Sequence, residues 1–313
     1  MIGRSLTAAS SVAAREFSTT SVAFKPVKNV TVIGSGLMGS GIAQVSAQAK
    51  LNVVLVDQSQ EVLDKAFKNI DTSVRRVAKK KFADDADKQA KLVEETLKGL
   101  SVTTNVEEAV ANADLVIEAI VENIDIKRKL FAQVEGAVKD STLIATNTSS
   151  LKLVDIAANL KNKERFGGLH FFNPVPVMKL LEVVRFDATS DETFNSLIEY
   201  GKSIGKTTVS CKDTPGFIVN RLLVPYMFEA LRMVERGDAT KEDVDVAMKL
   251  GAGYPMGPFQ LADYVGLDTC KFIMDGWVKA YPNEPIFKSS PALDKLVSEG
   301  KLGRKTGEGF YKY

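Results

Sequence analysis

His170 is the only histidine in the 313 residues of the chain. Imidazole has an unperturbed pKa of about 6.5, so histidine is the side chain best suited to proton transfer near neutral pH. An enzyme of this sequence that uses imidazole chemistry must therefore use His170. The alternative is a packed or surface histidine without a chemical role.

Glu182 is the residue most able to act together with His170. It lies in the apolar segment Leu180–Val184, where period-two alternation would place it on the opposite face from Leu181 and Val183. A carboxylate in an apolar strand is costly unless it is paired. Paired with one imidazole nitrogen, it would fix the tautomer, leave the other nitrogen as a general base and stabilise the imidazolium. The alternative for Glu182 is an exposed position on an edge strand.

A glycine-rich loop is the second feature able to do chemistry. It follows the β-branched segment 30–33, precedes an apolar helical segment near 42–49, and consists of Gly34, Ser35, Gly36, Leu37, Met38 and Gly39. In such a G-x-G-x-x-G pattern the glycines permit a tight turn, close approach of a pyrophosphate and close helix–strand packing. The N-terminus of the helix offers free N–H groups to the phosphates. The pattern predicts a dinucleotide site, and a glycine turn without a ligand is the alternative.

Asp57 ends the next predicted strand, over 52–57. An acid at this distance from the loop is expected to accept hydrogen bonds from the adenosine ribose. The following residues, 58–60, provide no cation for a 2′-phosphate, so the pattern favours NAD over NADP. The helix before this strand ends at Lys50 without the glycine that often caps such an end, which predicts a local cost in stability.

The composition indicates an ordinary enzyme. With 45% hydrophobic and 26% charged residues, the chain can bury a large core, and its length suggests two domains. A net charge of +2 does not indicate the strongly basic surface that binds nucleic acids. Cys211 and Cys270 cannot build a disulfide framework, and no Cys/His cluster is present for a metal, so we expect a reducing compartment and no metal site. Charges interrupt every long apolar stretch, which predicts no membrane span.

The first two dozen residues differ from the rest. They carry Arg4 and Arg15, are rich in serine and threonine, and contain no acid before Glu16. This composition is typical of an organellar transit peptide, and the segment 15–18 resembles a mitochondrial processing site. We predict that residues 1–24 are removed and that the mature protein lies in the mitochondrial matrix. A merely disordered N-terminus is the alternative.

The order of expected elements predicts an α/β fold with two domains. A Rossmann-type domain with a mostly parallel sheet is expected over 25–213, with an inserted helical hairpin over about 60–99, and an all-helical domain is expected over 214–313. Further strands are expected near 100–104, 114–120, 142–147, 166–172, 180–186 and 207–211. Helices are expected near 106–112, 124–138, 191–204, 216–236, after Thr240, and near 259–280 and 291–300.

The chain resembles the mitochondrial 3-hydroxyacyl-CoA dehydrogenase family from about Lys28 to Tyr313. The resemblance rests on the glycine-rich loop and on the segments 145–150, 168–176, 215–221 and 305–311. It implies NAD-dependent oxidation of the (S)-3-hydroxyl group of an acyl-CoA to the 3-ketoacyl-CoA in fatty-acid β-oxidation. It also implies a homodimer formed through the helical C-terminal domain.

The resemblance further implies residue roles. His170 resembles the family's base and Glu182 its orienting partner, while Ser149 and Asn220 match polar groups around the reacting oxygen. Implied contacts to the nicotinamide side or the ribose are Glu122, Lys127, Ser149, Asn173 and Lys305. Implied contacts to CoA are Ser73, Lys80 and Ser149. The end of the first helix at Lys50 departs from the glycine–histidine pair of close relatives, which bears on stability rather than on catalysis.

Several alternatives remain open from the residues alone. Ser149 could instead cap a helix that starts at Leu151, and the basic run 75–81 could be a solvated helix face. The whole chain could be an NAD-dependent dehydrogenase of a small hydroxy acid, or a crystallin-like structural protein on the same fold. In the helix near 216–236, we expect four apolar residues to be shared between the core and a dimer interface. They are Val224, Phe228, Leu231 and Val234.

Overall fold

The structure is a computed structural model that describes residues 24–313. The predicted transit peptide lies outside the described residues except for Phe24, so it stays a prediction.

One sheet forms the centre of the first domain. Its strands are β1 (Asn29–Ile33), β2 (Asn52–Val56), β3 (Leu100–Thr103), β4 (Leu115–Glu118), β5 (Leu143–Thr146), β6 (Phe166–Phe171), β7 (Leu180–Arg185) and β8 (Thr207–Lys212). Their order in the sheet is β3-β2-β1-β4-β5-β6-β7-β8. Every neighbouring pair is parallel except β6 and β7. The predicted mostly parallel sheet is confirmed.

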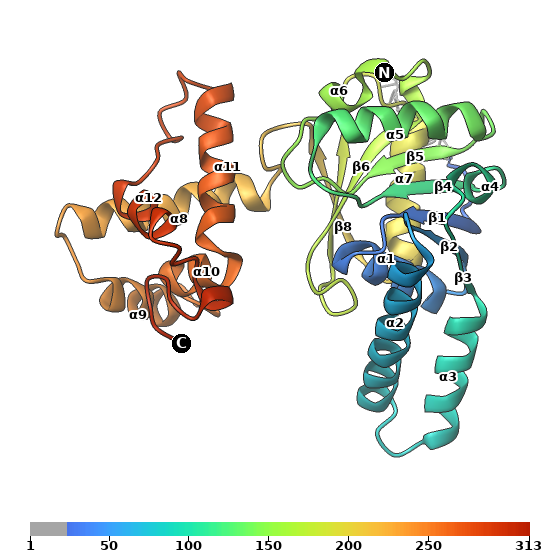
Figure 1. Ribbon diagram of the computed structural model, residues 1–313, viewed down its shortest axis with the longest axis horizontal. Helices are drawn as coiled ribbons and strands as arrows, with labels where there is room; N and C mark the ends of the chain where they lie inside the picture. The colour runs from blue at the N-terminus through green and yellow to red at the C-terminus, as the bar shows by residue number, and fades with distance from the viewer. Residues whose placement is uncertain (1–23) are drawn as a thin grey trace, which may run out of the picture.

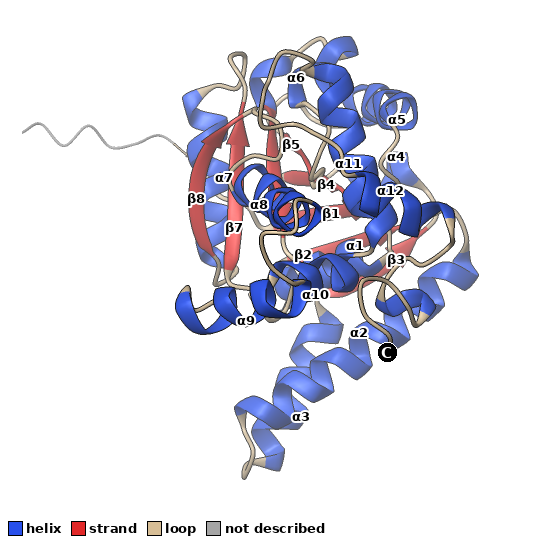
Figure 2. Ribbon diagram, turned by 90° about the vertical axis from the view of Figure 1, so that its left-hand side faces the viewer, coloured by secondary structure: helices blue, strands red, loops and turns tan. Residues whose placement is uncertain are grey.

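Helices cover both faces of the sheet, as Figure 2 shows in side view. One core joins the sheet to α1 (Leu37–Gln48), α2 (Gln60–Lys81), α3 (Ala86–Lys98) and α7 (Asp191–Ser203). A second core joins the opposite face to α4 (Val106–Val110), α5 (Ile124–Ala137) and α6 (Leu153–Ile156). Because both faces are covered, β4, β5 and β6 are buried along their whole length rather than at alternate positions.

The strand order changes direction between β1 and β4. The chain leaves β1 towards β2 and leaves β4 towards β5, so these neighbours diverge at their carboxyl ends. In open α/β sheets, ligands bind in the crevice outside the carboxyl ends at such a switch point. The topology therefore locates the expected ligand site at the end of β1, where the glycine-rich loop begins.

The predicted hairpin is present as α2 and α3, which project from the sheet side by side (Figure 1). The Ser59 side chain caps α2 by accepting a hydrogen bond from the N–H of Val62, and Lys79, Lys80 and Lys81 occupy its last turn. Capping oxygens at the N-terminus and cations at the C-terminus both stabilise a helix.

The end of α1 has the backbone conformation that glycine favours, in line with the predicted cost in stability, which stays a prediction. Lys50 has a φ of +65°, in the left-handed region that side chains other than glycine rarely adopt. The chain needs this conformation to turn from α1 into β2, and the lysine side chain makes it costly.

The C-terminal domain is helical and has its own core (Figure 1). Its helices are α8 (Val219–Glu235), α9 (Lys241–Gly251), α10 (Pro258–Val265), α11 (Leu267–Ala280) and α12 (Pro291–Ser298). The expected helical stretch 259–280 is divided by Gly266, whose φ of +102° cannot belong to a right-handed helix.

The expectation about α8 is wrong for Val224, Phe228 and Leu231, which are buried in the core of the C-terminal domain itself and have no surface to share with a second copy. Val234, the fourth residue, is only partly buried, so its place at an interface stays a prediction. The large apolar side chains that this domain exposes include Leu222 and Leu250 instead.

Within residues 24–313, no helix combines the length and the apolar character needed to cross a membrane. The same residues contain no group of three or more His, Cys, Asp or Glu side chains placed to hold a metal ion.

Candidate active site

The glycine-rich loop fits a pyrophosphate. Gly34 has a φ of +102°, and a Cβ on Gly39 would lie 1.7 Å from the carbonyl oxygen of Gly34, so neither position accepts a side chain. A Cβ on Gly36 would meet nothing within 4 Å, which leaves open space at the start of α1. No side chain caps α1 and no acid lies in its first turn, so its N–H groups are available to an anion.

Asp57 lies directly after β2, beside this loop. One carboxylate oxygen accepts hydrogen bonds from the N–H and the hydroxyl of Ser35, both at 2.7 Å, and the other accepts one from the N–H of Gln58 at 2.7 Å. Burial raises the pKa of Asp57, but the hydrogen bonds from Ser35 and Gln58 outweigh burial and hold the pKa below its ordinary value. An ionised acceptor at this place, with no cation directly after it, suits the ribose hydroxyls of NAD.

His170 and Glu182 are in contact. The antiparallel register of β6 and β7 places them opposite each other, and His170 Nδ1 lies 2.7 Å from Glu182 Oε2. Both side chains are buried, and the rings of Phe172 and Phe217 lie with their centroids 4.5 and 5.4 Å from that of the imidazole. Because a carboxylate only accepts, the neutral ring carries its proton on Nδ1, and Nε2 is left as an acceptor.

The second oxygen of Glu182 binds the start of the C-terminal domain. Oε1 accepts hydrogen bonds from the N–H groups of Ile218 and Val219, at 3.2 and 2.8 Å, where α8 begins. The positive end of the helix dipole favours a negative charge there. The alternative of an exposed edge position for Glu182 is therefore wrong, because β7 lies between β6 and β8 and the carboxylate is buried.

A cavity of about 340 Å³ lies beside His170, at the carboxyl ends of β4, β5 and β6. It gathers side chains from both domains. The residues predicted from the sequence that line it are Met38, Glu122, Lys127, Ser149, His170, Asn173 and Asn220. Positions more than a hundred residues apart in the chain thus meet around one small space.

Ser149 does not cap a helix. The short helix α6 begins at Leu153 and is preceded by Lys152, and the hydroxyl of Thr148, not Ser149, accepts a hydrogen bond from the N–H of Leu151 at 3.0 Å. The capping alternative is wrong, and the Ser149 side chain lines the cavity. Asn220, in the first turn of α8, donates a hydrogen bond to the carbonyl of Ser149 at 3.5 Å.

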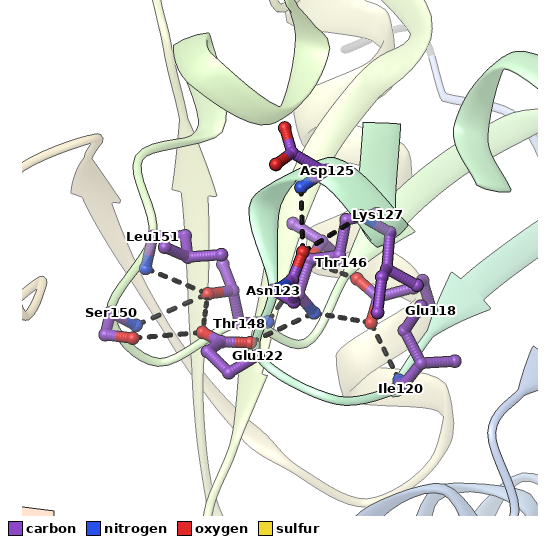
Figure 3. Close-up of polar contacts among 11 residues, drawn as sticks. Glu118, Ile120, Glu122, Asn123, Asp125, Lys127, Thr146, Thr148, Ser150 and Leu151 are labelled. Atoms are coloured by element: carbon purple, nitrogen blue, oxygen red, sulfur yellow. Dashed lines mark hydrogen bonds and ion pairs between the residues drawn. The ribbon is translucent and has the colours of Figure 1, made fainter. Parts of the chain in front are cut away.

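Glu122 and Lys127 belong to a buried polar network (Figure 3). The ammonium of Lys127 lies 2.5 Å from Glu118 Oε1 and 3.0 Å from Glu122 Oε2. Glu122 also accepts hydrogen bonds from the hydroxyls of Thr148 and Ser150. Burial raises the pKa of Glu122, but Lys127 and these hydroxyls together outweigh it and lower the pKa. Lys127 is thus an internal counter-ion, and a direct contact with the cofactor stays a prediction.

A second groove, of about 510 Å³, runs between α1, α2 and the segment 173–176. Of the predicted CoA contacts it includes Ser73 on α2, and of the predicted cofactor contacts it includes Asn173, which also lines the cavity beside His170. Three residues of the glycine-rich loop line it as well, namely Ser35, Gly36 and Leu37. Arg76 lines this groove and was not predicted, whereas Lys80 does not line it. Ser73, Arg76 and Lys80 nevertheless share one face of α2, because they are three and seven residues apart.

Lys305 is not brought to either cavity. Its ammonium lies 2.6 Å from both carboxylate oxygens of Asp268 in the C-terminal domain. A contact between Lys305 and the cofactor therefore stays a prediction.

Asn147 and Glu118 were missed from the sequence. Asn147 lines the cavity, and its side-chain oxygen accepts a hydrogen bond from the N–H of Phe171 at 3.0 Å. Glu118 is the buried partner of Lys127. An acid inside the apolar segment 115–118 was the available signal for Glu118, by the same argument that singled out Glu182.

A dinucleotide loop that opens beside a buried histidine–carboxylate pair is the arrangement of a nicotinamide-dependent dehydrogenase of alcohols. Residues 29–214 match the family model described as 3-hydroxyacyl-CoA dehydrogenase, NAD binding domain, and residues 216–313 match the C-terminal domain of the same family. The chain belongs to the 3-hydroxyacyl-CoA dehydrogenase family, and NAD is its cofactor.

Individual proteins that are similar to this chain carry names of the same family. A probable 3-hydroxyacyl-CoA dehydrogenase of Caenorhabditis elegans is 68% identical over 98% of this chain and 99% of its own length. The human mitochondrial hydroxyacyl-coenzyme A dehydrogenase is 58% identical over 92% of this chain and 91% of its own. Among solved structures, (S)-3-hydroxybutyryl-CoA dehydrogenase from Ralstonia eutropha has a TM-score of 0.86 at 38% identity, over 92% of this chain and 99% of its own.

Proposed function

We propose that the protein oxidises the (S)-3-hydroxyl group of an acyl-CoA to the 3-ketoacyl-CoA, with His170 as the general base. The observation that carries this proposal is the 2.7 Å contact of His170 with Glu182 on the wall of a cavity shared with Ser149 and Asn220. When bound, NAD⁺ supplies the acceptor for the hydride that leaves the substrate carbon.

The imidazole performs the proton transfer. Nε2 of the neutral ring takes the hydroxyl proton, while Glu182 keeps Nδ1 protonated and stabilises the imidazolium as it forms. A positioned base of this kind contributes about 10²–10⁴-fold to the rate. Ser149 and Asn220 hold the reacting oxygen by hydrogen bonds, so that its proton faces Nε2.

The acyl-CoA is proposed to lie along α2. The groove lined by Ser73 and Arg76 shares Asn173 with the catalytic cavity, which lets one extended ligand occupy both. Phosphate groups of CoA would meet the cations on the exposed face of the helix, with Lys80 beyond the groove.

The experiment that tests the substrate class is an NADH-oxidation assay with acetoacetyl-CoA and with free acetoacetate. Rapid turnover with acetoacetyl-CoA and slow turnover with acetoacetate are expected, because only the thioester carries the CoA that α2 would bind. Equal turnover with both would instead favour a dehydrogenase of small hydroxy acids.

We further propose that the protein acts in fatty-acid β-oxidation in the mitochondrial matrix, after removal of residues 1–24. The name of the human relative and the basic, serine-rich N-terminus support this location. Imaging of a C-terminal fluorescent fusion tests it, and a cytosolic signal would contradict it.

A homodimer is proposed through the C-terminal domain. Leu222 and Leu250, which are exposed to 69% and 83%, are apolar surface of this domain that a second copy would cover. Light scattering at micromolar concentration should give twice the mass of the mature chain, and a monomer would contradict the proposal.

A further inference from the structure

One positive charge lies between two negative charges beside the catalytic cavity, which Lys127 and Glu122 line. The carboxylate of Glu118 is fully buried, the ammonium of Lys127 is 1% exposed, and the carboxylate of Glu122 is 29% exposed (Figure 3). The distances of 2.5 and 3.0 Å show that Lys127 serves both carboxylates at once. The Glu118–Lys127–Glu122 cluster therefore carries one uncompensated negative charge.

The other partners of the cluster are neutral. Glu118 accepts hydrogen bonds from the N–H of Ile120 and the hydroxyl of Thr146, both at 2.7 Å. Glu122 accepts from the hydroxyls of Thr148 and Ser150. These donors hold the carboxylates in place, but they add no positive charge. The uncompensated charge is consequently fixed in position by β4, β5 and α5.

The cluster faces the place where the cofactor changes its charge. Glu122 and Lys127 line the same cavity as His170, and the hydride acceptor must lie within reach of the carbon whose hydroxyl His170 deprotonates. The nicotinamide ring is cationic when oxidised and neutral when reduced. A fixed negative charge on the cavity wall acts on the first state and leaves the second almost unaffected.

We propose that the Glu118–Lys127–Glu122 cluster selects the oxidised cofactor by charge, so that it strengthens binding of NAD⁺ relative to NADH. The proposal rests on the proposed function only in that the nicotinamide enters the cavity beside His170. Glu118 acts through Lys127 and is a positioning residue for the charge, since it does not line the cavity itself.

The expected size of the effect follows from burial. Salt screens buried charges only weakly. At an effective dielectric constant of about 20, a unit charge about 12 Å from the ring changes the ratio of the two dissociation constants by about tenfold, and a nearer charge changes it by more.

The test is a pair of matched variants whose NAD⁺ and NADH dissociation constants are measured in the absence of acyl-CoA. NADH is titrated by its fluorescence, and NAD⁺ by competition with NADH. Glu118→Gln keeps the shape, since its amide oxygen still accepts from Ile120 and Lys127 and its amide N–H₂ can donate to Thr146. It removes only the charge. Thr146→Val disturbs the same network without changing the charge.

Glu118→Gln should raise the ratio of Kd for NAD⁺ to Kd for NADH by about tenfold or more, whereas Thr146→Val should leave the ratio as it is in the wild type. An unchanged ratio in Glu118→Gln would overturn the proposal, even if both constants rose together, because a purely structural role weakens both forms equally. Should Glu118→Gln fail to fold, Glu122→Gln at the cavity surface decides by the same ratio.

An error in the proposed substrate can be distinguished from an error in the proposed role of the cluster. Activity of the wild type with acetoacetyl-CoA reports on the substrate, whereas the ratio of cofactor dissociation constants needs no substrate. A negative outcome of either measurement therefore does not decide the outcome of the other.

Discussion

His170 and Glu182 face each other across the one antiparallel strand pair of the sheet, with 2.7 Å between Nδ1 and Oε2. The other oxygen of Glu182 binds the first N–H groups of α8. The carboxylate that contacts His170 is therefore also the link between β7 and the C-terminal domain, which contributes Asn220 to the cavity.

Lys50→Gly should stabilise the protein. The φ of +65° at Lys50 costs a side-chain-bearing residue roughly 1 kcal/mol that glycine does not pay. The ion pair of Lys50 with Glu95, at 3.6 Å, is exposed and contributes little. Chemical denaturation should show an increase in the free energy of unfolding of about 1 kcal/mol. Lys91→Gly, inside α3, is the control and should destabilise by a similar amount. A loss of stability in Lys50→Gly would contradict the assignment of strain.

Asp57→Ala should weaken NAD⁺ binding by about 1.5–3 kcal/mol, the value of hydrogen bonds to a charged group. Calorimetric titration measures this directly. Ser35→Ala is the matched control, since it removes one hydroxyl donor to Asp57 and leaves the carboxylate free to bind the ribose. An unchanged affinity of Asp57→Ala for NAD⁺ would contradict hydrogen bonding between Asp57 and the ribose.

Lys80→Ala should raise the KM for acyl-CoA several-fold and leave the KM for NAD⁺ close to its original value, because Lys80 lies on the α2 face of Ser73 and away from the glycine-rich loop. Arg76→Ala should have the larger effect, as Arg76 lines the groove. Lys79→Ala, on a neighbouring face, serves as the control. Equal changes in the KM for acyl-CoA and the KM for NAD⁺ would contradict CoA binding at this face of α2.

Glu122 should make the free energy of unfolding depend on pH in the acid range. Its folded pKa is lowered below the ordinary 4.5, so its contribution to stability is fully present above pH 4.5 and is lost as the pH falls through the folded pKa. The difference in unfolding free energy between the wild type and Glu122→Gln should be constant above pH 4.5 and shrink below it. Glu94→Gln, on the exposed side of α3, is the control. A difference that grew as the pH fell would contradict a lowered pKa of Glu122 in the folded protein.

Much of the fold follows from local patterns. The β-branched segments, the glycine-rich loop and the Ser59 cap of α2 each specify their own conformation, and the resulting elements agree with the structure within a few residues. The division at Gly266 was missed because the apolar pattern continues across it, although a glycine with positive φ interrupts the backbone.

The site was less predictable where it depends on long-range packing. The cost of burying Glu182 indicated a partner, and His170 was the available one, but no local pattern shows that the start of α8 supplies the other two donors. Lys127 was expected at the cofactor, a contact that stays a prediction, but the two carboxylates beside its ammonium, those of Glu118 and Glu122, were not foreseen. Only the packing of α5 against β4 brings these charges together.

The central claim is that His170 and Glu182 act as one unit, and a double-mutant cycle on kcat with acetoacetyl-CoA tests it most directly. His170→Gln should lower kcat by about 10²–10⁴-fold while NADH still binds, since the glycine-rich loop and Asp57 remain. Glu182→Gln should also lower kcat substantially, and the double variant should be little worse than His170→Gln alone. Losses that multiply as independent effects, or near-wild-type turnover in His170→Gln, would contradict the account.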